Sequence, residues 1–220
     1  MKKDLTELVF ILDRSGSMQG LERDTIGGFN SMLEKHNATD GECVVTTVLF
    51  NGEYELLHER LDILKIKPIT DKEYFVRGNT ALLDAMGKTI NKIGNDLNNA
   101  LEENRPEHVM FVIITDGEEN ASKEFTRDQI KQMVEHQTEV YKWEFIFLGA
   151  NIDAFSVADS IGVQRSKTAN YYADSEGTEK NFEVIHNLKS MMMKKDYSNE
   201  KAERLMKEIE DETYKKKIKK

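Results

Sequence analysis

The sequence from Leu8 to Met18 reads LVFILDRSGSM, in which a continuous apolar run is followed at once by Asp13, Ser15 and Ser17. Short continuous apolar runs are typical of parallel strands that are buried on both faces of a sheet. We therefore predict a buried strand over Leu8–Leu12 that ends at Asp13. Three oxygen-bearing side chains would then lie on the loop directly after this strand.

Similar apolar runs recur along the chain and alternate with amphipathic, helix-like segments. Asn51-Gly52 lies directly between two strand-like runs, which is the strongest short signal for a hairpin, so the third strand should run antiparallel to the second. The predicted strands are Leu8–Leu12, Cys43–Phe50, Tyr54–Leu61, Val109–Thr115, Trp143–Leu148 and Lys167–Tyr172. Helices are predicted after Gly20, from Leu82 to Ile93, over Thr126–Tyr141 and over Ala154–Ile161. This alternation predicts an α/β fold: a Rossmann-like, doubly wound, mainly parallel sheet in the order 3-2-1-4-5-6, with helices on both faces.

The end of the chain follows a different pattern. From about Thr178 the apolar residues have helical spacing, and a second amphipathic stretch lies within Asn199–Tyr214. We expect two parts, a sheet domain over residues 1–177 and a helical extension over 178–220 that ends in a charged tail. The extension would either pack on the sheet or serve as a second docking element. We read the cluster Met191–Met193 as adaptable core filler.

The composition argues against nucleic acid and membranes as partners and indicates the compartment in which the protein works. The formal net charge of −9 disfavours nucleic acid as a general partner. No apolar run approaches the roughly 20 residues of a membrane-spanning helix. A single cysteine, Cys43, excludes an intrachain disulfide and suits a reducing compartment, so we expect a cytoplasmic protein that is not bound to membranes.

Polar side chains gather at the ends of the predicted strands. Thr115-Asp116-Gly117 follows the fourth strand, and Gly78-Asn79-Thr80 precedes a helix. In open α/β sheets ligands bind outside the carboxyl ends of the strands, especially where the strand order reverses. Carboxylates and hydroxyls are hard oxygen ligands of the kind that Mg²⁺ prefers, and the absence of nitrogen and sulfur ligands argues against zinc or copper. The predicted metal ligands are Asp13, Ser15, Ser17, Thr80 and Asp116.

These residues resemble the metal-ion-dependent adhesion site of von Willebrand factor type A domains. The stretches FILDRSGSM, GNTALLDA and FVIITDGEEN occur in the order of that family, and the resemblance covers about residues 4–165. Within bacteria the chain resembles the small cytoplasmic proteins of this type, including those near tellurite-resistance and AAA+ ATPase systems. The resemblance implies a stress-response or AAA+ ATPase-linked assembly as the setting.

The resemblance also implies a role for each ligand. Ser15 and Ser17 would coordinate Mg²⁺, or Mn²⁺ or Ca²⁺, directly. Thr80 would coordinate it directly or through water, and Asp13 and Asp116 would either bind it or orient its water ligands. One position would stay open for an Asp or Glu of a partner protein. The expected function is therefore a metal-dependent protein-binding module without enzymatic activity.

Other interpretations of the same residues remain open. The chain could be a magnesium-dependent hydrolase or phosphoryl-transfer enzyme, because such enzymes also place an Asp after the first strand. The metal could also be purely structural. Ser15 and Ser17 alone could cap a following helix.

Charged residues beside the predicted ligands need an interpretation of their own. We expect Arg14 to point away from the site toward the surface or a partner. Glu118 and Glu119 would form a solvated rim, and neither Asp84 nor Asp153 is expected to be a ligand. The five histidines lack the spacing of a metal site and are expected to be structural or exposed.

Overall fold

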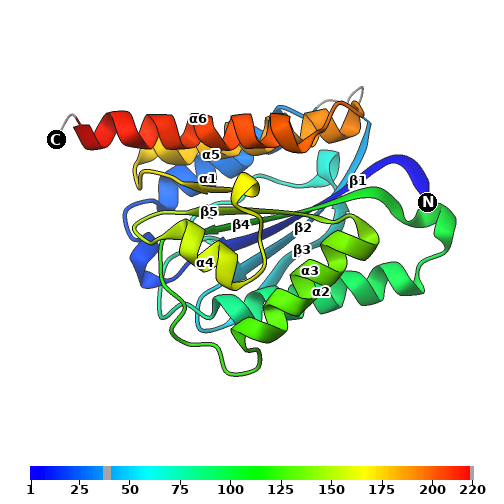
Figure 1. Cartoon of the computed structure of the whole chain (residues 1–220), viewed down its shortest axis with the longest axis horizontal. Helices are drawn as coiled ribbons and strands as arrows, with labels where there is room; N and C mark the ends of the chain where they lie inside the picture. Colours follow the sequence, from blue (N-terminus) through cyan, green and yellow to red (C-terminus); the bar gives the residue numbers. More distant parts are fainter. Residues whose placement is uncertain (37–40, 219–220) are drawn as a thin grey trace.

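A computed structural model of the chain describes residues 1–36 and 41–218. Six strands form one sheet in the order β3-β2-β1-β4-β5-β6, in which β3 is antiparallel to β2 and the other neighbours are parallel (Figure 1). The predicted α/β, doubly wound architecture and its strand order are confirmed. The strands are β1 Lys2–Asp13, β2 Glu42–Phe50, β3 Tyr54–Asp62, β4 Pro106–Thr115, β5 Glu144–Gly149 and β6 Thr168–Asn170.

Helices cover both faces of the sheet. The helices are α1 Glu22–Glu34, α2 Leu82–Asn99, α3 Arg127–Tyr141, α4 Ala154–Ser160, α5 Ser175–Met193 and α6 Asn199–Ile218. One hydrophobic cluster joins the sheet to α1, α5 and α6, and a second joins its other face to α2, α3 and α4. Figure 1 shows α1, α5 and α6 on one side of the sheet and α2 and α3 on the other.

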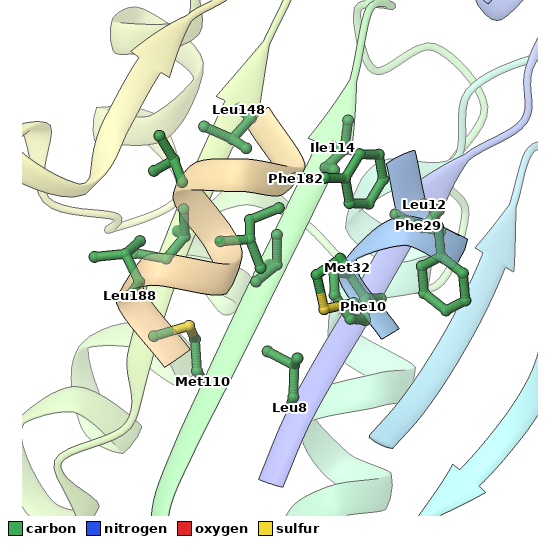
Figure 2. Packing of buried hydrophobic residues seen from close by; sticks show 14 of the residues in the cluster. Leu8, Phe10, Leu12, Phe29, Met32, Met110, Ile114, Leu148, Phe182 and Leu188 are labelled. Atoms are coloured by element: carbon green, nitrogen blue, oxygen red, sulfur yellow. The ribbon is translucent and has the colours of Figure 1, made fainter. Parts of the chain in front are cut away.

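The alternation of side chains along β1 explains how one apolar run serves two cores. Leu8, Phe10 and Leu12 point to the cluster of α1 and α5, whereas Val9 and Ile11 belong to the cluster of α2. Figure 2 shows the first three packed beside side chains of α1 and α5. Because both faces of β1 are covered, its residues must be apolar on both sides, which is the pattern that the sequence shows.

Several elements differ in extent from their predictions, among them β4, which begins at Pro106, and α2, which extends to Asn99. β1 begins at Lys2, because a shift of register between Lys2 and Thr6 lets polar residues continue the pairing with β4. β6 is limited to Thr168–Asn170, because residues 165–167 form a 3-10 turn. α5 begins at Ser175, since the Asp174 side chain caps it by accepting a hydrogen bond from the Gly177 N–H.

The segment after residue 178 shares the core of the sheet. Within α5, Phe182, Ile185 and Leu188 are buried in the same cluster as β1 and β4, and Met192 and Met193 are buried there too. α6 lies along α5 and over β6, with Ala202, Leu205, Met206 and Ile209 buried. The division into 1–177 and 178–220 stays a prediction. Among the residues that the structure describes, no helix is long and apolar enough to cross a membrane.

Candidate metal centre

The sheet brings the three predicted loops to one edge. β1 and β4 pair in parallel, with Leu12 opposite Ile114, so the loops after them leave the sheet side by side. The third loop is joined to the first by a hydrogen bond of 2.9 Å from the Gly16 N–H to the Gly78 carbonyl. Gly78 has a φ of 72°, a left-handed conformation that suits glycine. All five predicted ligands therefore belong to one rim of the sheet.

Three hydroxyl groups lie at this rim, where Ser15 Oγ contacts the other two. The Thr80 hydroxyl donates to Ser15 Oγ at 3.0 Å, and Ser15 Oγ is 2.9 Å from Ser17 Oγ. Ser15 and Thr80 are buried, whereas Ser17 is exposed, so the group opens to solvent on the Ser17 side. A methyl group on Gly117 would lie only 2.8 Å from Ser17 Oγ and 2.9 Å from Thr80 Oγ1. A side chain at position 117 would thus fill the space beside the hydroxyls.

Asp13 is fully buried, and its carboxylate is hydrogen-bonded to the loop that carries Ser15. One carboxylate oxygen accepts from the Ser15 N–H at 2.7 Å, and the other accepts from the Thr115 hydroxyl at 2.6 Å. Burial raises the pKa of Asp13 to about 6, while the hydrogen bonds from Thr115 and Ser15 oppose that rise. Because both of its oxygens accept hydrogen bonds, Asp13 holds the loop in place. At neutral pH its carboxylate is mostly ionised and adds negative charge to the site.

Asp116 differs from Asp13 in the hydrogen bonding of its carboxylate. Its side chain is buried, yet within residues 1–36 and 41–218 neither carboxylate oxygen makes a hydrogen bond of good geometry. Burial raises the pKa of Asp116, and the nearby Ser17 hydroxyl and Asn151 offset part of the rise. A buried carboxylate without well-formed hydrogen bonds is costly, because water no longer solvates its charge. A cation beside Asp116 would remove that cost.

The donor set fits a hard divalent cation. Three hydroxyl oxygens and two carboxylates supply oxygen ligands only, as Mg²⁺ and Mn²⁺ prefer. Over the described part of the chain, no group of three or more His, Cys, Asp or Glu side chains is arranged to hold a metal. The site is different in kind, because three of its five candidate ligands are serine and threonine hydroxyls.

The structure also bears on the capping alternative. Ser15 precedes a short 3-10 turn at Gly16–Met18, but its hydroxyl makes no capping hydrogen bond to that turn. The long helix α1 begins later, at Glu22, and the residue at its N-cap position is Leu21, which makes no side-chain capping hydrogen bond. The serine hydroxyls contact each other instead of the helix, so capping does not explain them.

Arg14 points away from the site as predicted, but the prediction that it faces the surface or a partner is wrong. Its side chain is buried, and its Nη1 lies 2.7 Å from Glu55 Oε2 of β3, with the guanidinium 5.3 Å from the centre of the Phe75 ring. Its backbone N–H donates to the Phe50 carbonyl. Arg14 thus points from the loop into the region between β3 and the 66–80 segment, where it anchors the loop that carries Asp13 and Ser15.

The prediction that Glu119 is a solvated rim residue is also wrong, because its half-buried carboxylate is engaged by the chain itself. Its carboxylate accepts hydrogen bonds from the backbone N–H groups of Leu83, Ala121 and Ser122. It therefore ties the loop after β4 to the first turn of α2. Glu118 is exposed, as expected for a rim residue.

Sequence reasoning missed several residues that hold the site in shape. Thr115 positions Asp13, and Asn120 Oδ1 accepts from the Thr80 N–H at 3.0 Å. Asn51 donates through Nδ2 to the Arg77 carbonyl, and the backbone carbonyl of Asn51 accepts from the Ala81 N–H. Thr115 could have been suspected from its place just before Asp116. The other two join segments far apart in sequence and carry no local signal.

No protein-family model matches the sequence, and a search of curated proteins gives no match. Similar solved structures include proximal thread matrix protein 1 from the mussel byssus with a zinc-occupied MIDAS motif, with 13% identity and a TM-score of 0.57. The ArnB paralog VWA2 of Sulfolobus acidocaldarius has 16% identity and a TM-score of 0.53. The manganese-loaded TRAP protein of Plasmodium vivax has 15% identity and a TM-score of 0.57.

These likenesses extend over most of the chain. They cover 86%, 83% and 81% of it, respectively, and 47%, 44% and 72% of the three proteins compared. The chain thus spans less than half of the mussel and Sulfolobus chains. At such low identity the similarity concerns the fold, and it agrees with the observed strand order and with the single antiparallel strand. The chain has the fold of a von Willebrand factor type A domain.

Proposed function

We propose that the chain is a metal-dependent protein-binding module. Its site would bind Mg²⁺ or a similar divalent ion through Ser15, Ser17 and Thr80, with Asp13 and Asp116 close by. One observation carries the proposal: three hydroxyls joined through Ser15 lie beside a buried carboxylate, Asp116, whose oxygens make no hydrogen bond of good geometry with the described residues. A bound cation would satisfy that carboxylate and use the hydroxyl oxygens as ligands.

The arrangement also favours an incoming acidic residue. Neutral hydroxyls donate little charge, so a bound ion would keep most of its positive charge and attract a partner's carboxylate. The exposed Ser17 side leaves access for an Asp or Glu of a partner protein. Asp13, which is held by Thr115 and Ser15, would stabilise the charge without occupying the open side.

Binding is better supported than phosphoryl transfer. A nucleophilic Asp needs a carboxylate oxygen that can reach the substrate. Asp13 is fully buried and both of its oxygens accept hydrogen bonds, so it is poorly placed for attack. We therefore propose a module without enzymatic activity.

The metal is proposed only as a class of ion. The mussel protein has zinc in its motif and the Plasmodium protein holds manganese, and oxygen ligands discriminate weakly among Mg²⁺, Mn²⁺ and Ca²⁺. The cytoplasmic location and the assembly linked to stress response or to an AAA+ ATPase are supported by the sequence resemblance alone.

The first experiment is a calorimetric titration of Mg²⁺ and Mn²⁺ into the wild-type protein, Asp13→Ala and Gly117→Ala. We expect saturable binding to the wild type and a loss of at least about tenfold in affinity for either variant. Asp13→Ala removes a carboxylate from the site, and Gly117→Ala places a methyl group within 3 Å of two hydroxyls. Capture of a partner from lysate should then be sensitive to chelator and lost with Asp13→Ala.

Gly52→Ala is the matched control, since a methyl group there has no neighbour within 4 Å. It should bind metal as the wild type does, and thermal unfolding should show that all variants are folded. Unchanged metal affinity in both Asp13→Ala and Gly117→Ala would refute the site. Saturable metal binding together with chelator-resistant partner capture would leave the metal a structural role.

A further inference from the structure

A pocket adjoins the candidate metal centre. It has a volume of about 420 Å³ and lies between the β2–β3 turn, the start of α2 and the loop after β4. Asn79 and Ala81 line it, while Thr80 between them turns its hydroxyl to Ser15. Asn120 also lines the pocket and accepts a hydrogen bond from the Thr80 N–H. The pocket and the metal centre therefore share one wall.

The carboxylates of the pocket are already engaged. Asp84 accepts from three successive backbone N–H groups of the loop after β4, at 2.8 to 3.0 Å. Glu53 Oε2 lies 2.8 Å from Arg77 Nη2, and Glu124 Oε1 lies 2.7 Å from Lys88 Nζ. Each negative charge in the lining thus has its own donors, so the carboxylates contribute little uncompensated field.

Two side chains of the lining, Lys123 and Asn120, keep free hydrogen-bond donors. The exposed Lys123 side chain has no hydrogen bond or ion pair with any residue that the structure describes. Asn120 uses its carbonyl oxygen toward Thr80 and keeps its amide N–H₂ as a donor. Small residues such as Gly52, Ala85 and Ala121 line the remaining wall and leave room for a side chain. An anionic group would match this set of donors.

We propose that this pocket receives a second acidic side chain of the partner, close in sequence to the acid that meets the metal. This inference rests on the proposed function, because the metal would fix where the partner segment lies. The ligand chemistry is a carboxylate on a short acidic peptide. Lys123 supplies the charge, and Asn120 supplies a neutral donor beside it.

The test uses synthetic peptides with one fixed Asp and an Ala/Gly background. Each peptide carries one further varied residue at a position within four residues of the Asp, and binding is measured with Mg²⁺ present. Wild type should prefer Asp or Glu at one of these positions by about tenfold over Ala, which is the lower end of the range for a hydrogen bond to a charged group, as suits an exposed lysine. Lys123→Glu should remove this preference and favour Lys or Arg at the same position.

The matched control is Lys207→Glu, which makes the same change of charge at an exposed position on α6. It should keep the wild-type peptide preference. Calorimetry should show that Lys123→Glu binds Mg²⁺ within about threefold of wild type, so that a change of preference is not loss of the metal. Two results would overturn this inference alone. In the first, the acidic preference survives in Lys123→Glu. In the second, wild type shows no such preference although the fixed Asp still binds in the presence of Mg²⁺. Failure of wild type to bind metal or the fixed Asp would overturn the proposed function and this inference together.

Discussion

Glu7 is a buried carboxylate in the middle of the sheet, far along β1 from the candidate site. Its side chain is fully covered, and Arg60 Nε of β3 lies 3.2 Å from its Oε2. Burial raises the pKa of Glu7 to about 7, and Asp96 of α2 adds to the rise, while Arg60, Thr46 and Lys92 oppose it. The group therefore changes charge near neutral pH in the folded protein.

This shift predicts how stability depends on pH. In the unfolded chain Glu7 loses its proton near the ordinary value of 4.5, but the folded protein keeps it up to about 7. The folded state therefore binds more protons between these values, and the contribution of Glu7 to the free energy of unfolding falls as the pH rises through that window. The full loss is roughly 3 kcal/mol, from about 1.4 kcal/mol per pKa unit.

Glu7→Gln should remove this pH-dependent contribution to the free energy of unfolding. Urea unfolding at pH 5 and pH 8 should show a difference in stability between the two pH values that is smaller than in wild type by up to about 3 kcal/mol. Glu103→Gln, at an exposed position in the turn before β4, should leave the difference unchanged. An unchanged difference in Glu7→Gln would show that Glu7 titrates in the folded protein as it does in the unfolded chain.

Single residues also show what the sequence could predict of the site. The five candidate ligands could be placed on one rim because strand ends in a parallel sheet share an edge. Arg14 could not be placed, since its direction depends on Glu55 and Phe75, which come from other segments. Glu119 was misjudged because three backbone N–H groups, one of them from α2, decide its role. Contacts between distant segments carry no local pattern.

At the scale of elements, α1 and α5 approach each other closely at Gly28. A methyl group on Gly28 would lie 2.3 Å from the ring of Phe182, whereas one on the adjacent Gly27 would have no neighbour within 4 Å. Phe182 also packs edge-on to Phe29, and Figure 2 shows both rings near the labelled residues of β1. The two glycines therefore differ in surroundings although they are neighbours in one helix.

Replacing each glycine by alanine should give effects of opposite sign. Gly28→Ala forces the Phe182 ring to move and should destabilise the protein by about 1–3 kcal/mol. Gly27→Ala should stabilise it by about 0.5–1 kcal/mol, because alanine loses less backbone entropy in a helix than glycine. Denaturant unfolding measures both. Equal effects at the two positions would mean that α1 and α5 are not in this close contact.

Elements were predictable where their pattern is local. The hairpin followed from Asn51-Gly52, and the Asn51 side chain does accept a hydrogen bond from the Glu53 N–H. The capping box at Thr126 and Gln129 starts α3 close to its predicted start. The first residues of β1 were missed because they are polar and gain their strand conformation from pairing with β4.

At the scale of the whole molecule, α6 decides whether the end of the chain unfolds with the sheet. Its buried residues, Leu205 among them, belong to the same cluster as β1 and β4, and Glu208 pairs with Lys180 of α5 at 2.9 Å. The single tryptophan, Trp143, lies buried in the cluster on the opposite face of the sheet. Its fluorescence therefore reports the sheet, whereas circular dichroism reports mainly the helices.

Leu205→Ala tests this coupling. If α6 is part of one cooperative unit, the variant should lose about 2–4 kcal/mol, and the fluorescence and circular dichroism transitions should shift together. Arg204→Ala changes an exposed neighbour on the same helix and should stay within about 0.5 kcal/mol of wild type. A circular dichroism transition that moves to lower denaturant while Trp143 fluorescence stays in place would contradict the coupling. In that case α6 would unfold independently of the sheet, as a separate helix free to dock elsewhere.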